Sequence, residues 1–198
     1  MSDLFMDILK RECMKKCVHW DISDEVMSKA LESEKKLYDQ HKNSPERVLS
    51  TVHNDRIGSI AQLAVNEYLS TLPYDVITSD PFESGQHSDK FDFMYDDEWC
   101  DVMGFGMKGE GYYWITDNWR MRCHNHKQKR EMNNYVFVGV DERKSVIHIA
   151  GVISALSFWN SAKPVDYDED KPERERRSWV PASLLRGFRD FYFHTTSD

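Results

Sequence analysis

Two adjacent segments rich in β-branched residues, 135–140 and 146–153, constrain the fold of this chain more than any other feature. The second, VIHIAGVI, is apolar almost without interruption, and residues 141–144 between the two segments are polar. A strand covered on one face alternates apolar and polar residues, whereas a continuous apolar run is typical of a strand buried on both faces. The pair therefore predicts a hairpin with a buried central strand in a sheet that is covered by other elements.

The N-terminal part of the chain predicts two helices. Residues 21–24 offer an N-cap before a segment with apolar residues at helical spacing. Ser44 followed by Pro45 is a second helix start, and this helix is expected to run to about Leu72. Its apolar face consists of Ile57, Ile60, Ala61, Ala64 and Tyr68. We expect an α/β domain over residues 46–198, with a central mixed β-sheet flanked by helices, and a helical N-terminal extension over residues 1–45.

Composition indicates a globular, cytoplasmic protein. A hydrophobic content of 40% over 198 residues excludes a disordered chain. No apolar run reaches the roughly 18–20 residues of a membrane helix, and four cysteines without a signal peptide favour reduced thiols. The net charge of -8 excludes a protein whose whole surface binds nucleic acid, because phosphate binding depends on Lys and Arg. A local basic groove stays compatible with it.

One basic cluster is a candidate for such a groove. It follows a glycine-rich stretch and the aromatic residues 112–114, so we expect it in a loop that contacts a nucleic-acid backbone. Its members are Arg120, Arg122, Lys127, Lys129 and Arg130.

Acidic residues in a second predicted hairpin are candidates for a metal site. Residues 90–95 alternate polar and apolar side chains, residues 96–98 form a polar turn, and residues 99–105 resume an apolar strand. Asp92 lies on the first strand and Asp101 on the second. Because strand residues i and i+2 share a face, such a hairpin can bring two acids and a nearby cation together. Carboxylates that converge on Mg²⁺, with a cation beside them, are what phosphodiester cleavage requires.

The chain resembles the PD-(D/E)XK nucleases, and in particular small phage-encoded members. The resemblance covers most of residues 56–190. It is carried by residues 58–69 (GSIAQLAVNEYL), 90–105 (KFDFMYDDEWCDVMGF), 135–140, 146–154 (VIHIAGVIS) and 179–190 (WVPASLLRGFRD). It implies a restriction-endonuclease-like fold, a host-cytoplasmic location, and Mg²⁺ or Mn²⁺ bound by Asp92 and Asp101.

Two positions depart from the family pattern. The helix glutamate falls on Gln62, and the lysine two residues after the second acid falls on Met103. Gln62 still offers a carbonyl oxygen, but Met103 has neither a donor nor a charge. Lys108, five residues further on, is the candidate for a relocated lysine, and Glu67 is a poorer substitute for the helix acid.

Three functions follow from these residues. The first hypothesis is a nuclease-fold protein that has impaired or lost catalysis and acts by binding DNA or a protein. The second is an active Mg²⁺-dependent deoxyribonuclease that uses Asp92, Asp101, Gln62 and a relocated Lys108. The third is an acidic inhibitor that occupies the nucleic-acid groove of a host protein, which the charge of -8 suits.

Overall fold

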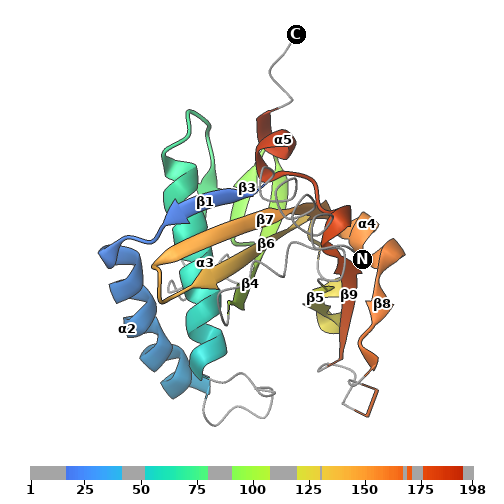
Figure 1. Cartoon of the computed structure of the whole chain (residues 1–198), viewed down its shortest axis with the longest axis horizontal. Coiled ribbons are helices and arrows are strands. Elements are labelled where there is room, and N and C mark those ends of the chain that lie inside the picture. Colours follow the sequence, from blue (N-terminus) through green and yellow to red (C-terminus); the bar gives the residue numbers. More distant parts are fainter. Residues whose placement is uncertain are drawn as a thin grey trace, which may run out of the picture.

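A six-stranded mixed β-sheet forms the centre of the molecule in a computed structural model (Figure 1). The structure describes residues 17–41, 52–79, 91–107, 120–129, 131–166, 169–170 and 176–193. Strands β4 and β6 are parallel, and all other neighbours in this sheet are antiparallel. In spatial order the strands are β1 (Val18–Asp21), β7 (Val146–Ser154), β6 (Asn134–Asp141), β4 (Glu98–Gly106), β3 (Phe93–Tyr95) and β2 (Ile77–Thr78).

The two segments with the strongest apolar pattern are the adjacent strands β6 and β7. Every residue of β6 is buried, and the two strands pair from Asn134 opposite Ser154 to Asp141 opposite Val146. Side chains of both strands enter two separate hydrophobic clusters, one on each face of the sheet. The expected hairpin with strands buried on both faces is confirmed.

Helices α2 (Asp24–His41) and α3 (Val52–Ser70) cover one face of the sheet (Figure 1). The predicted apolar face of α3 is buried from Ile57 to Tyr68 and packs against β4, β6 and β7. Gly104 of β4 makes the approach of α3 possible, because a Cβ there would lie 2.8 Å from the Ala61 Cβ. The helix that precedes the candidate hairpin thus lies directly on its second strand.

The other face is covered by α4 (Ala155–Ser161) and by a second, three-stranded sheet. In this small sheet the order is β5 (Arg120–His124), β9 (Arg177–Pro181) and β8 (Lys163–Pro164). Short helical segments complete the description: η2 (Asn125–Lys129), η5 (Ala182–Leu184) and α5 (Phe188–Phe193). In Figure 1 the small sheet stands to the right of the main sheet.

The structure confirms the general fold and adds detail on the N-terminal residues and on the basic cluster. A mixed sheet flanked by helices is confirmed, and so is the hairpin of β3 and β4, whose turn holds Asp96 and Asp97 at positive φ. Within residues 1–45, where a helical extension is expected, β1 pairs with β7 and α2 packs on α3. No helix of the described part of the chain is long and apolar enough to cross a membrane.

The basic cluster lies in regular structure rather than in the expected loop. Arg120 and Arg122 belong to β5, and Lys127 belongs to η2. The reason is that Met121 and Cys123 alternate with the basic residues and are buried against the main sheet. A strand with one apolar side is the result.

We expect Gly104→Ala to lower the free energy of unfolding by about 1–3 kcal/mol, because the added Cβ would overlap α3. Gly58→Ala is the matched control in α3, where the new Cβ meets no atom within 4 Å, and it should raise stability by up to about 1 kcal/mol. Urea unfolding followed by circular dichroism measures both. Equal effects of the two substitutions would contradict the close packing of α3 on β4.

Candidate active site

Asp92 and Asp101 come together at the point where the pairing of β3 with β4 ends. The Asp92 backbone N–H donates to the Cys100 carbonyl over 2.9 Å, and the Val102 N–H donates to Asp92 Oδ2 over 2.5 Å. The Asp92 carboxylate therefore accepts the hydrogen bond from the Val102 N–H that a neighbouring strand would otherwise accept. Asp101 is 6% exposed, and its carboxyl group lies close enough to influence the pKa of Asp92.

This arrangement strongly favours a proton on one of the two acids. Burial raises the pKa of Asp92 to about 8, and the nearby charge of Asp101 adds to the increase. The charge of Lys127 and the hydrogen bond from the Val102 N–H lower the pKa of Asp92, but they do not cancel the increase. Two carboxylates that share a site repel each other, and a bound cation removes that repulsion. The pair therefore has the electrostatic character of a cation site.

Lys127 supplies a positive charge at these acids. Its Nζ lies 2.5 Å from Asp101 Oδ2 and 3.4 Å from Met103 Sδ. Burial alone would lower the pKa of this ammonium group, but the charge and hydrogen bond of Asp101 outweigh burial and raise the pKa. Lys127 is thus a cation largely removed from solvent and held beside Asp101 and Met103 of β4.

The backbone of Lys127 is held from the far side. The Tyr135 hydroxyl donates to the Lys127 carbonyl over 3.3 Å, and Trp159 Nε1 donates to the Tyr135 hydroxyl over 3.0 Å. Tyr135 belongs to β6 and Trp159 to α4, so both partners lie on rigid elements. This chain of hydrogen bonds fixes η2 against the main sheet.

The ammonium group beside Asp101 and Met103 therefore comes from a distant segment of the chain. Met103 points to the same side of β4 as Asp101, and its sulfur contacts Lys127 Nζ. Lys108, the expected substitute, lies outside the described residues. Spacing along the chain gave no sign of Lys127 in this role, because it follows Asp101 by 26 residues.

Gln62 has a supporting position. Its Nε2 donates to the Ser79 hydroxyl over 3.1 Å and to the Ser79 carbonyl over 3.3 Å. The Ser79 N–H in turn donates to the Asp92 carbonyl over 3.0 Å. Gln62 therefore positions the backbone that bears Asp92. Glu67, the poorer substitute, accepts a hydrogen bond from Trp20 Nε1 and is engaged elsewhere.

The donor set suits Mg²⁺ better than a metal that needs a full protein cage. In the described part of the chain no three His, Cys, Asp or Glu side chains gather in a way that could hold a metal ion. Mg²⁺ usually keeps several waters and is bound through one or two carboxylates together with substrate phosphates. Asp92 and Asp101 are the two carboxyl groups that this part of the structure brings together.

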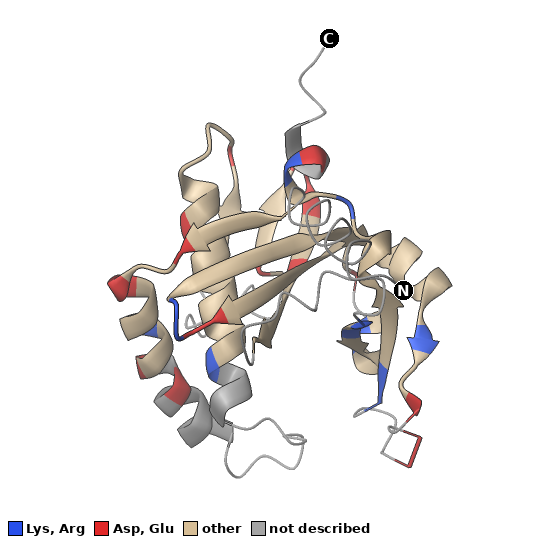
Figure 2. Ribbon diagram, in the orientation of Figure 1, with Lys and Arg blue, Asp and Glu red and all other residues tan. Residues whose placement is uncertain are grey.

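Basic residues line a cavity that includes Met103. Arg120 and Arg122 of β5 line it, together with His124 and Arg177, which the sequence did not assign to the same surface. The alternation of residues 120–124 (RMRCH) was the signal that could have revealed a strand with a basic side. Figure 2 shows Lys and Arg on the strands of the small sheet and many of the acids on α2, across the molecule. The Lys129 side chain and Arg130 lie outside the described residues.

The chain was also compared with known proteins. Neither protein-family models, nor curated proteins, nor solved structures give a match. The function is therefore inferred from the geometry of Asp92, Asp101 and Lys127 and from the fold around them.

Proposed function

We propose that this protein is a metal-dependent phosphodiesterase that cleaves DNA, a nuclease of the PD-(D/E)XK type with a relocated lysine. The observation that carries the proposal is the position of Lys127 Nζ between Asp101 Oδ2 and Met103 Sδ. Two acids and one ammonium group at a single point are the side chains that this chemistry uses. Lys127 thereby supplies the positive charge that a lysine would provide at position 103.

The protein groups have distinct roles in the proposed reaction. Asp92 and Asp101 would hold Mg²⁺, which when bound would supply Lewis acidity toward the phosphodiester and lower the pKa of a water. Lys127 orients the attacking water by hydrogen bonding and neutralises charge that develops on the phosphate. Burial strengthens these interactions, because Asp101 and Lys127 are largely removed from solvent.

The order of elements supports the same proposal. A helix, α3, precedes an antiparallel hairpin that bears both acids, and the second hairpin strand, β4, then pairs in parallel with β6. This order is compatible with the restriction-endonuclease-like fold that the resemblance implies. Loss of catalysis was the first hypothesis because two positions, Gln62 and Met103, depart from the family pattern. The ammonium group of Lys127 answers the departure at Met103, and Gln62 still lacks the charge of a glutamate.

The first prediction concerns Lys127. We expect Lys127→Met to lower the rate of Mg²⁺-dependent DNA cleavage by about 10²–10³-fold, because it removes the charge that stabilises the transition state. Lys144→Met, in an exposed turn, is the control and should leave the rate unchanged. Cleavage of plasmid and single-stranded DNA in Mg²⁺ or Mn²⁺ measures the rate.

A charge swap separates this role from a structural one. In Lys127→Met with Met103→Lys, an ammonium group returns to the same place, so cleavage should recover at least about tenfold relative to Lys127→Met. Full activity of Lys127→Met would exclude the assigned role. A wild-type chain without cleavage in either metal would favour the binding scaffold instead.

The second prediction concerns the metal. Titration calorimetry should detect binding of Mg²⁺ and Mn²⁺ to the wild-type chain, and Asp92→Asn or Asp101→Asn should weaken it by about tenfold or more, because a carboxylate ligand is lost. Asp75→Asn, at an exposed position, serves as the control. EDTA should abolish cleavage. Unchanged metal binding in both site variants would place the metal elsewhere.

A further inference from the structure

A cavity of about 640 Å³ lies between the end of β4 and the small sheet. Its apolar part includes Met103 and Phe105 of β4 and Phe137 of β6. Its polar part is cationic or imidazole in character, with Arg120, Arg122, His124 and Arg177. The cavity thus combines an apolar surface with several donors for an anion.

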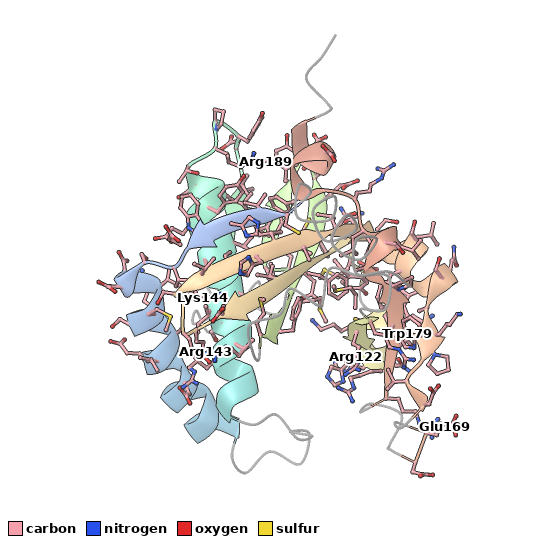
Figure 3. The ribbon with its side chains drawn as sticks, in the orientation of Figure 1. Arg122, Arg143, Lys144, Glu169, Trp179 and Arg189 are labelled. Atoms are coloured by element: carbon pink, nitrogen blue, oxygen red, sulfur yellow. The ribbon has the colours of Figure 1, made fainter. Side chains whose placement is uncertain are left out.

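The basic residues share one face of the small sheet. Arg122 is directly opposite Trp179, and His124 is directly opposite Arg177, on the antiparallel strands β5 and β9. Directly opposed residues of antiparallel strands point to the same side. The guanidinium of Arg120 lies 4.4 Å from the ring centre of Trp179, and its Nη1 lies 4.0 Å from Asp166 Oδ2. Figure 3 shows Arg122 and Trp179 on neighbouring strands of this sheet.

Met103 connects this cavity with the candidate active site. It lines the cavity, and its sulfur contacts Lys127 Nζ, which in turn is bonded to Asp101. Met103 is thus the residue that the lining of the cavity shares with the surroundings of Lys127 and Asp101.

The chemistry of the lining favours an unpaired DNA strand. A volume of this size is typical of a pocket for a small ligand, which is the scale of a nucleotide rather than of a duplex. Bases can pack against Met103 and Phe105 only when they are not paired and stacked in a duplex. The polar side chains that line the cavity in the described part of the chain include three arginines and one histidine. These side chains suit the phosphate backbone, which all sequences share, and the choice of DNA follows from the proposed function.

We propose that this cavity binds single-stranded DNA, with its phosphates against Arg122 and Arg177 and its bases toward Met103 and Phe105. This inference rests on the proposed nuclease function and names its substrate. The strand then presents a phosphodiester to Asp92, Asp101 and Lys127. Binding is independent of sequence and sensitive to salt, because it depends mainly on phosphate contacts.

The test is a binding measurement on the full chain in EDTA, where cleavage is prevented. Fluorescence anisotropy compares a labelled DNA strand, the same strand annealed to its complement, and RNA of the same sequence. The DNA strand should bind at least about tenfold more tightly than the duplex and more tightly than the RNA. Preference for the duplex or for RNA would overturn the proposal.

Charge-matched variants locate the binding surface. Arg122→Gln with Arg177→Gln should weaken single-strand binding by about tenfold or more and reduce the slope of log affinity against log salt by about 0.7 for each lost phosphate contact. Arg143→Gln with Arg189→Gln removes the same net charge at exposed positions that lie away from Arg122 (Figure 3) and should change affinity by less than about threefold. Equal losses in the two double variants would overturn the cavity as the site. If circular dichroism shows that the first double variant does not fold, Arg122→Gln alone is compared with Arg143→Gln on the same criterion.

Cleavage in Mg²⁺, measured separately, distinguishes the two proposals. Binding with the expected preference but without cleavage would refute the nuclease function and leave the single-strand site intact. Equal cleavage of duplex and single-stranded DNA, unaffected by the substitutions at Arg122 and Arg177, would support the nuclease function and refute the cavity as its substrate site.

Discussion

The largely desolvated ion pair of Lys127 with Asp101 is the interaction on which the candidate site depends. Removing one partner would leave the other charge uncompensated. Lys127 and Asp101 come from segments that are far apart in sequence, so the pair forms only when η2 is packed against β4. The hydrogen bonds from Trp159 to Tyr135 and from Tyr135 to the Lys127 carbonyl hold η2 in that position. Tertiary packing thus sets the electrostatics of the site.

The opposite face of the main sheet positions the acids. Helix α3 approaches β4 at Gly104, and from the same helix Gln62 bonds to Ser79, whose N–H bonds to the Asp92 carbonyl. The Asp92 carboxylate then accepts from the Val102 N–H. Gln62 and Met103 therefore both have structural roles next to the candidate site. Gln62 supports the segment that bears Asp92, and Met103 packs against the ammonium group of Lys127.

Local patterns in the sequence were sufficient for the sheet and the two acids, but not for the cation. The hairpin with Asp92 and Asp101 depends on alternation and on a polar turn, and both are visible in neighbouring residues. Lys127 is brought to Asp101 by packing across the sheet, which leaves no periodic signal. The sequence of β5 was only partly sufficient to predict its structure. Its alternation is present, but the basic residues led to the interpretation of a loop, although Met121 and Cys123 are buried.

One continuous segment contributes to both proposals, and this couples them. Strand β5 carries Arg120 and Arg122 to the cavity, and η2 follows it directly and carries Lys127 to Asp101. If the small sheet moved so that its arginines left a bound DNA strand, the ammonium group of Lys127 would also move away from Asp92 and Asp101. Phosphate contacts that hold β5 in place would therefore favour the arrangement in which Lys127 is paired, because a ligand stabilises the state that it binds. In a nuclease with this arrangement, the packing of β5 and η2 on the main sheet would govern both the binding of the DNA backbone and the position of Lys127 at the acids.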